Sequence, residues 1–253
     1  MTDELALEIA VEAARAAGEI ALKYYRTGFK VTLKPDHTPV TQADREAEKT
    51  IIGILSHHYP DHGFLGEESG ARGREDVRWI IDPIDGTKNF VRHIPVWATL
   101  IALEERGDIT VGVVYNPVTG DLFTARRGHG AFHNGVRLSV STIADLGSAA
   151  LLHAGVGFLR QGGYWDGFVR LVDATERQRG FGDYMGYQLV AEGKGELYLE
   201  SDLKPWDLAP CRLLVEEAGG RFTDFTGAPT IYSGTALATN GRVHDAALAL
   251  FRG

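Results

Sequence analysis

The segment WIIDPIDGT, residues 79–87, places two carboxylates directly after an apolar run. Asp82 follows two isoleucines where a buried strand is expected to leave the core, and Asp85 comes one residue out of step with strand alternation. Pro83 stiffens the exit, so a turn can aim both side chains at one point. Two like charges about 4 Å apart repel by about 4 kcal/mol at a surface-like dielectric. Because a bound cation would reverse that balance, the segment predicts a metal site.

Two further segments place acidic residues in similar positions. FLGEESG puts Glu67 and Glu68 after an apolar pair, and KPWDLAPC puts Asp207 at the opening of a helix. Oxygen ligands without His or Cys suit a hard cation such as Mg²⁺, which is normally held by few carboxylates together with phosphate oxygens of a substrate. The placement of acids at strand or helix ends, where the backbone is rigid, favours a metal site.

Each of these acids also has a purely structural alternative. Asp207 can be a helix N-cap, and Asp85 followed by glycine is a common turn dipeptide. Glu67 and Glu68 can belong to a solvated loop, paired with one of the nearby arginines at 72 and 74. The alternatives stay open for each segment taken singly.

The segment DGTKNF, residues 85–90, adds a candidate phosphate site. If Gly86 and Thr87 begin a helical turn after the strand, the N–H groups there can bind a phosphate oxygen, and glycine lets the ligand approach the backbone closely. The Thr87 hydroxyl beside two acids can orient a water molecule, with a carboxylate such as Asp44 accepting its proton in turn. The segment therefore predicts chemistry on a phosphate ester.

The elements that must position these residues follow from hydrophobic periodicity. The spacing of apolar residues predicts a long amphipathic helix over 4–25 and a second helix from near Thr41, which can cap it, to Pro60, which stops it. Ile51, Ile52, Ile54 and Leu55 are expected to form the buried face of the second helix. Consecutive antiparallel strands are then predicted in RWIID, VWATLIALEERG, DITVGVVYNPVTG and DLFTARRGHGAFHNG. The first half thus looks like two helices on a meander sheet.

After about residue 142 helical and strand patterns alternate, which suggests an α/β layer. Helices are expected over 164–177, 184–193 and 207–218 and in a closing segment that runs to Phe251, with strands at GELYLE, 221–223 and TALAT. We therefore predict an N-terminal α+β lobe, residues 1–142, with the metal and phosphate motifs, and a C-terminal α/β lobe, residues 143–253, which supplies Asp207 and the residues that select the substrate. No Gly/Ser or Pro linker separates the halves.

Composition excludes several classes of function. The 253 residues are 44% hydrophobic, and the net charge of -8 has no basic block, which argues against a nucleic-acid partner or an anionic membrane surface. No run approaches the length of a membrane span and the N-terminus is acidic, so we expect a cytoplasmic protein. The single Cys211 excludes an internal disulfide and a multi-cysteine zinc site and is expected on the apolar side of a helix. The histidines lack the spacing of zinc or Ser-His-Asp sites.

GEES, WIIDPIDGTKNF and PWDLAPCRLLVEEAGGRFTDFTG, in this order and at these separations, closely resemble the motifs of the inositol monophosphatase-like superfamily of magnesium-dependent phosphatases. The similarity spans nearly the whole chain and includes GVVYNPVTGDLFTARRGHGAFHNG. It implies an α/β (α+β) fold, a layered αβαβα sandwich of the inositol monophosphatase and fructose bisphosphatase type, and a homodimer. It also implies two to three Mg²⁺ ions per active site, with Mn²⁺ as an alternative.

The resemblance assigns metal ligands by position. Glu67, Asp82 and the carbonyl of Ile84 resemble the ligands of a first metal, and Asp82, Asp85 and Asp207 resemble those of a second. Glu67 also faces a third, weaker metal in the family. Metals so placed can activate a water molecule and stabilise the leaving alkoxide without a covalent enzyme intermediate.

The same resemblance assigns the remaining catalytic groups. Gly86 and Thr87 look like the backbone phosphate binders, and Thr87 with Asp44 resembles the pair that activates the attacking water. Glu68 is similar to an acid that lies near the metal ligands in the family, and we predict it as a catalytic residue. A non-catalytic module that binds metal and phosphate remains an alternative, which an intact set of ligands together with a water-activating threonine disfavours.

Substrate choice depends on residues beyond the phosphate. Lys88, in DGTK, is typical of bacterial histidinol-phosphate phosphatases and of adenosine bisphosphate phosphatases, and Asp183 follows glycine as in the histidinol-phosphatase version of its motif. Glu200 matches the acid that reaches the organic part of the substrate. Asp183 and Glu200 suit a cationic alcohol, which favours L-histidinol phosphate, an intermediate of histidine biosynthesis, over inositol 1-phosphate, fructose 1,6-bisphosphate or adenosine 3',5'-bisphosphate. As alternatives, Asp183 can cap the helix that follows it, and Arg179 can pair with either acid, touch the phosphate or lie on the surface.

Overall fold

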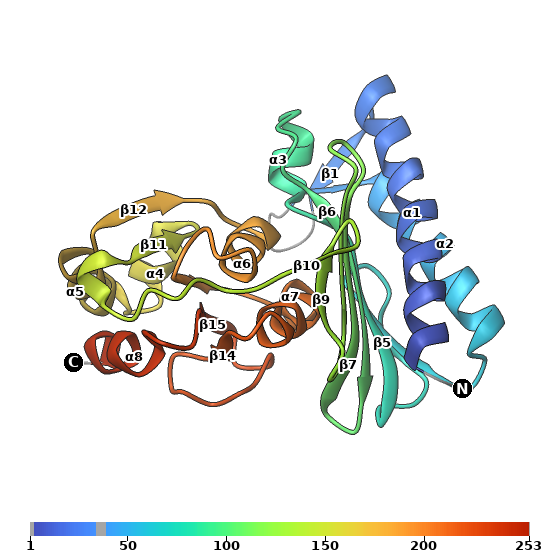
Figure 1. Ribbon diagram of the computed structural model, residues 1–253. Helices are drawn as coiled ribbons and strands as arrows, with labels where there is room; N and C mark the ends of the chain where they lie inside the picture. The colour runs from blue at the N-terminus through green and yellow to red at the C-terminus, as the bar shows by residue number, and fades with distance from the viewer. Residues whose placement is uncertain (1–2, 34–38, 253) are drawn as a thin grey trace. The chain divides into compact units, whose positions relative to one another are not determined.

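The computed structural model describes residues 3–33 and 39–252, and the chain divides into two compact units, Met1–Arg127 and Gly128–Gly253 (Figure 1). The lobe boundary predicted at residue 142 falls later in the chain, inside the second unit. Among the described residues, no helix combines the length and the apolar character needed to cross a bilayer.

Two helices of the first unit confirm the helical predictions. α1 (Asp3–Thr27) buries small residues on one side, so α2 (Gln42–His58) can pack closely against it. Thr41 is the N-cap of α2, where its hydroxyl oxygen accepts a hydrogen bond from the N–H of Ala43 at 3.1 Å. Ile51 and Leu55 are fully buried, whereas the other two isoleucines predicted for this face are only partly buried.

The sheet of the first unit lies against these two helices. Its strands follow the order β8 (Asp121–Arg126), β7 (Asp108–Asn116), β6 (Ala98–Glu105), β5 (Val77–Asp85), β3 (Gly63–Gly66) and β4 (Gly70–Arg72). β5 to β8 form the predicted antiparallel meander. β3 pairs in parallel with β5, which the sequence did not indicate because so short a strand has no readable alternation. A separate two-stranded ladder joins β1 (Val31–Leu33) to β2 (Pro39–Thr41).

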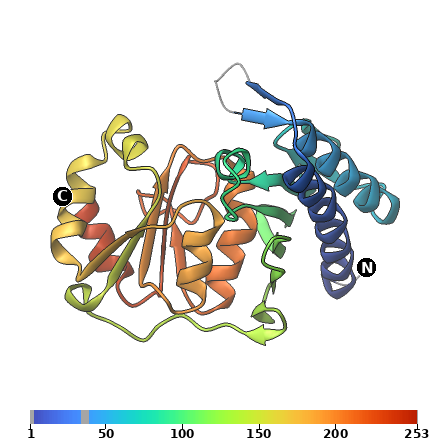
Figure 2. The same ribbon diagram turned by 90° about the horizontal axis from the view of Figure 1, so that it is seen from above.

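The second unit is a five-stranded sheet with helices on both faces. The strand order is β12 (Arg177–Gly180), β11 (Ala150–His153), β13 (Leu197–Ser201), β15 (Thr235–Thr239) and β14 (Arg221–Thr223). α4 (Val156–Gln161), α5 (Trp165–Ala174) and α8 (His244–Arg252) cover one face, and α6 (Tyr184–Ala191) and α7 (Pro205–Glu217) cover the other (Figure 2). The short β9 (Gly130–His133), β10 (Val136–Arg137) and a 3₁₀ turn (Leu146–Ser148) precede this sheet in the chain.

Most elements predicted for the second half are present, with shifted ends. The helix expected over 164–177 ends at Ala174, because Thr175 turns the chain into extended backbone that leads to β12. β11, α4 and β12 were not predicted, since each has six residues or fewer and no strong periodicity. Cys211 is buried in α7, as expected from its apolar surroundings.

His244, the first residue of α8, is fully buried between two threonines. Its Nε2 lies 3.0 Å from the hydroxyl of Thr223, which donates its own proton to the carbonyl of Asp224, so Nε2 must carry hydrogen. Its Nδ1 lies 3.0 Å from the hydroxyl of Thr239, which accepts from the N–H of Gly241 and is therefore free to donate to Nδ1. The network suits a neutral imidazole. Burial, supported by nearby Arg221, lowers the pKa of His244 to about 4.

His244→Gln is expected to make the free energy of unfolding less dependent on pH between pH 6.5 and 4. Since the pKa of His244 is about 4 in the folded state and about 6.5 in an unfolded chain, its contribution is complete above pH 6.5 and is lost as the pH falls toward 4. The loss amounts to about 3 kcal/mol. Urea unfolding at pH 7, 6, 5 and 4 should therefore show wild type and His244→Gln converging in stability as the pH falls. Parallel curves would contradict the assignment of a neutral, buried imidazole.

Candidate active site

β5 ends in a bulge that turns two aspartates toward one point. Along its ladder with β6, Asp82 pairs with Leu100 and Asp85 pairs with Ala98, so β5 has one residue more than its partner in this interval. The hydroxyl of Thr99 holds the bulge by donating to the carbonyl of Pro83 at 3.0 Å. One carboxylate oxygen of Asp82 lies within 4.8 Å of one of Asp85. The predicted break in strand alternation is confirmed.

The two aspartates form a buried concentration of negative charge. Both side chains are almost wholly buried, and the N–H of Ile84 donates to Oδ1 of Asp82 at 3.0 Å. Two carboxylates at this spacing repel by about 3 kcal/mol at an effective dielectric near 20. A divalent cation would turn the repulsion into attraction. The available donors, two carboxylates and the carbonyl of Ile84, are all oxygen, so the donor set fits Mg²⁺.

The turn that carries Glu67 and Glu68 is held by a residue that the sequence analysis missed. Glu48, on α2 and buried, accepts hydrogen bonds from the N–H of Glu68 at 2.9 Å and from the N–H of Ser69 at 2.8 Å. The N–H of Glu67 donates to the carbonyl of Ile81 at 3.1 Å, which ties this turn to β5. Glu48 therefore holds this turn against α2.

Gly66 makes this arrangement possible. A Cβ at this position would lie 2.6 Å from Oε2 of Glu48, so only glycine leaves room for the buried carboxylate. The sequence does contain a signal for Glu48, because Asp44 and Glu48 are four residues apart and therefore share one face of α2. Two acids on the buried face of a helix indicate that each must receive hydrogen bonds.

The predicted helical turn after Asp85 is present. Gly86 has φ of 81° and ψ of 36°, a left-handed conformation that favours glycine, and α3 (Thr87–Val91) begins at the next residue. The first N–H groups of a helix have no partner inside the helix, so those near Gly86 and Thr87 are suited to an anion. Their role in phosphate binding stays a prediction.

The expected hydrogen bond between Thr87 and Asp44 is not formed. The Thr87 hydroxyl donates to the carbonyl of Ile84 at 3.0 Å, whereas Oδ2 of Asp44 accepts from the N–H of Thr41 at 2.7 Å and from its hydroxyl at 2.6 Å. The local capping box of α2 competes successfully for this carboxylate. Burial raises the pKa of Asp44 to about 7, against the hydrogen bonds from Thr41, and Glu67 and Glu68 raise it further.

Asp207 lies in the second unit, in the first turn of α7. Lys204 precedes this helix as its N-cap, and its N–H donates to Oδ2 of Asp207 at 2.7 Å. The alternative that Asp207 is itself the N-cap is therefore wrong, because the N-cap lies three residues earlier. The Asp207 carboxylate still accepts a hydrogen bond from the N–H at the start of the helix.

Asp183 and Glu200, both of the second unit, lie at neighbouring element ends. Asp183 immediately precedes α6 but makes no side-chain capping bond, so the capping alternative is not supported. Glu200, near the end of β13, accepts a short hydrogen bond from the hydroxyl of Tyr198. Its surroundings withdraw the carboxyl from water and raise its pKa to about 8, and the negative charges of Asp183 and Asp207 add to that rise.

Arg179 does not join these acids in the structure. It lies on β12, an exposed edge strand, and its Nη1 donates to the carbonyl of Gln178 at 2.7 Å. Among the described residues it forms no ion pair with Asp183 or Glu200, so of the alternatives left open the surface position fits its place on the exposed edge strand. A role in touching the phosphate stays a prediction.

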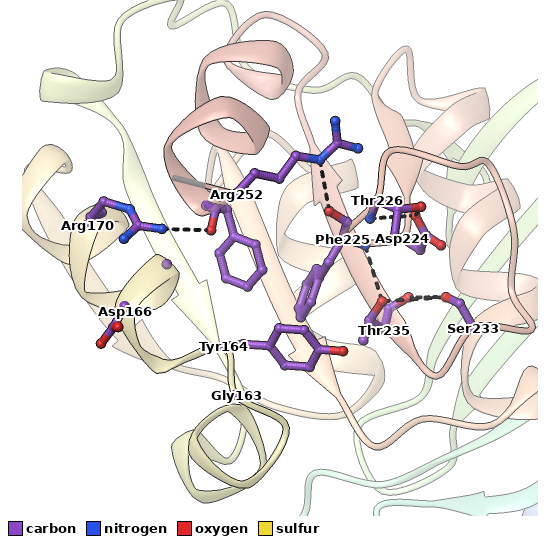
Figure 3. Close-up of a pocket in the computed structure, with 12 residues that line it drawn as sticks. Gly163, Tyr164, Asp166, Arg170, Asp224, Phe225, Thr226, Ser233, Thr235 and Arg252 are labelled. Carbon is purple, nitrogen blue, oxygen red and sulfur yellow. Dashed lines mark hydrogen bonds between the residues drawn. The ribbon is translucent and has the colours of Figure 1, made fainter.

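A cavity of about 500 Å³ in the second unit contains none of the predicted site residues (Figure 3). Tyr164, Phe225 and Phe251 supply its aromatic wall. Its arginines are engaged with the main chain: Nε of Arg170 donates to the carbonyl of Leu250 at 2.6 Å, and Nε of Arg252 donates to that of Phe225 at 3.3 Å. These contacts tie α8 to the rest of the unit, which is a structural role.

Asp183→Gly is expected to stabilise the fold and weaken the site. Asp183 has φ of 56° and ψ of -155°, close to a region that only glycine occupies readily. Such strain costs about 1–3 kcal/mol, and the extra freedom of an unfolded glycine offsets about 0.5–1 kcal/mol. We expect a gain of about 1 kcal/mol in urea unfolding, with Asp183→Asn, which keeps the strain, near wild type. A loss of stability in the glycine variant would show that the side chain holds this turn together.

Comparison with known proteins places the chain in a family. The model of the inositol monophosphatase family matches residues 3–252. The histidinol-phosphatase of Mycobacterium tuberculosis is 43% identical over 255 residues, covering 97% of this chain and 96% of that protein. The Nus factor SuhB of Escherichia coli K12 is 39% identical over 256 residues, covering 97% and 95%.

Solved structures agree with this placement. The extragenic suppressor protein SuhB of Bartonella henselae matches with a TM-score of 0.91 and 35% identity, covering 98% of each chain. The inositol monophosphatase of Anabaena matches with a TM-score of 0.87 and 33% identity, covering 98% of this chain and 96% of that one. The fold type implied by the motifs is thereby confirmed. With matching motifs, a matching family model and matching structures over nearly its whole length, the chain belongs to the inositol monophosphatase family.

Proposed function

We propose that the protein is a Mg²⁺-dependent phosphomonoesterase that hydrolyses L-histidinol phosphate to L-histidinol and phosphate. Membership of a phosphatase family supports the reaction type. The acid pair of Asp183 and Glu200 carries the choice of substrate, because two carboxylates at one place favour an alcohol with an ammonium group and a titratable imidazole. Three relatives, 39% to 44% identical, bear the name histidinol-phosphatase.

The metals would be held by oxygen ligands. In this proposal the ligands are the carboxylates of Glu67, Asp82, Asp85 and Asp207 and the carbonyl of Ile84. Bound divalent ions would neutralise these acids, lower the pKa of water and stabilise charge on the phosphoryl oxygens and the leaving alkoxide.

The chain's own groups would orient the reactants. N–H groups of Gly86 and Thr87 would hold a phosphoryl oxygen at the start of α3. Because the Thr87 hydroxyl gives its proton to the carbonyl of Ile84, its oxygen remains an acceptor that can orient a water O–H. Asp44, with a pKa near neutrality, and Glu68 are the carboxylates proposed to take part in proton transfer.

Inositol 1-phosphate is the second candidate substrate. A solved inositol monophosphatase, 33% identical, is similar over nearly the same share of this chain as the histidinol-phosphatase of Mycobacterium tuberculosis. Inositol carries only hydroxyl groups, so its recognition would not require the charge of Asp183 and Glu200. The two candidates therefore differ in their dependence on this acid pair.

Phosphate release from histidinol phosphate, inositol 1-phosphate and fructose 1,6-bisphosphate tests the proposal. We expect the highest kcat/KM for histidinol phosphate, with activity lost on chelation by EDTA and restored by Mg²⁺. A higher kcat/KM for inositol 1-phosphate would overturn the first choice of substrate. Phosphate binding without turnover of any ester would indicate a binding module. The homodimer implied by the resemblance stays a prediction, which sedimentation equilibrium can test.

A further inference from the structure

β13 places Tyr198 and Glu200 on the same face of the sheet, because strand residues two apart share a face. α6 covers that face, and Gly186 of α6 provides the space for the tyrosine ring. A Cβ on Gly186 would lie 2.3 Å from that ring. The ring of Tyr187 then packs edge-on against Tyr198, with centroids 4.6 Å apart. Tyr198 is fully buried, so packing leaves it little freedom.

The Tyr198 hydroxyl contacts the carboxylate of Glu200 and the backbone carbonyl of Asp183. It forms a short hydrogen bond with Oε2 of Glu200 and lies 3.4 Å from the carbonyl oxygen of Asp183. A phenol has a single proton, so its hydrogen bond to the closer carboxylate is the stronger one and its contact with the carbonyl is weak. A rigid ring thus connects the end of β13 to the residue that begins α6.

The backbone conformation of Asp183 indicates that this contact has a function. Its left-handed conformation is costly for any residue with a side chain, and strain of this kind persists where the surroundings impose it. The carbonyl of Asp183 also accepts the N–H of Gly186 at 3.3 Å. The Tyr198 hydroxyl and the Gly186 N–H therefore donate to the same carbonyl of this strained residue.

We propose that Tyr198 is a positioning residue that holds the carboxylate of Glu200 and the backbone of Asp183 as one recognition unit for the cationic part of the substrate. This inference rests on the proposed function, because it concerns how the acid pair selects a cationic alcohol. Tyr198 itself does not touch the substrate. Its effect is transmitted through Glu200, so removing its hydroxyl should matter only while that carboxylate is present.

A double-mutant cycle tests the proposal. KM and kcat are measured for histidinol phosphate and for β-glycerophosphate, an ester of a neutral alcohol, in wild type, Tyr198→Phe, Glu200→Gln and the double variant. Removing one partner of a buried hydrogen bond is enough to change binding about tenfold. Tyr198→Phe should raise KM for histidinol phosphate about tenfold with little change in kcat, and should leave KM for β-glycerophosphate unchanged. In the Glu200→Gln background, where the amide keeps an acceptor oxygen but no negative charge, the same substitution should have a much smaller effect.

Tyr187→Phe is the matched control, because it removes one hydroxyl from the same aromatic cluster and leaves both Tyr198 and Glu200 in place. It should leave both KM values unchanged. Equal increases for both esters in Tyr198→Phe, or additive effects in the double variant, would overturn the proposal in favour of a structural role. If wild type has no activity on histidinol phosphate, the proposed function fails first. If wild type is active and Tyr198→Phe behaves like wild type, only the present inference fails.

Discussion

Asp85→Asn is expected to lower kcat by about two to three orders of magnitude while the fold remains intact. Asp85 lies beside Asp82 at the bulge of β5, and the asparagine keeps the shape of the side chain but removes one of the charges that would bind the cation. Steady-state kinetics at saturating Mg²⁺ measures the loss. Asp76→Asn, an exposed aspartate of the same unit that pairs with Arg74, is the control and should retain full activity.

The same substitution should separate metal binding from folding. Without metal, Asp85→Asn removes the repulsion of about 3 kcal/mol between two buried carboxylates, so its free energy of unfolding should equal or exceed that of wild type. With Mg²⁺, wild type should gain stability through binding, whereas the variant should gain much less. Equal stabilisation of both proteins by Mg²⁺ would show that Asp85 is not a ligand.

Glu48→Ala is expected to lower the free energy of unfolding by about 1–3 kcal/mol, because it leaves two partly buried N–H groups without their acceptor. The loosened turn carries Glu67 and Glu68, so the Mg²⁺ concentration needed for half-maximal activity should also rise. Urea unfolding and a Mg²⁺ titration of activity measure the two effects. The substitution tests a residue that binds neither metal nor substrate in our proposal.

Glu46→Ala provides a matched control on the same helix. Glu46 is exposed and bonds to Tyr24 and Gln42, so its loss should cost no more than about 0.5 kcal/mol and leave the Mg²⁺ requirement unchanged. Glu48→Gln, which keeps one acceptor oxygen, should fall between wild type and Glu48→Ala. A stable Glu48→Ala protein with a normal Mg²⁺ requirement would exclude the positioning role.

Sequence patterns predicted the long elements and the local chemistry because these depend on near neighbours. The periodicity of α1 and α2, the meander of β5 to β8 and the turn after Asp85 are all present. The metal-binding pattern could also be read, since an acid at the end of an apolar strand is visible within a few residues. Motif order and separation then indicated the family, which the comparisons confirm.

Contacts between distant residues were decided only by the tertiary structure. Asp44 was expected to accept a hydrogen bond from Thr87. Instead Thr41, three residues earlier, donates two hydrogen bonds to the Asp44 carboxylate. Glu48 acquired its role because parallel pairing of β3 with β5 brings the turn after Gly66 over α2. Tyr198 acquired its role because Gly186 admits its ring beneath α6.

What the sequence by itself determined was therefore the class of fold, the acidic motifs and the family, because periodicity, turn residues and motif spacing are local properties of the chain. Only the folded chain decided which hydrogen bonds those acids make. A buried carboxylate takes the donors that packing brings within about 3 Å, and packing depends on residues that lie far apart in the sequence.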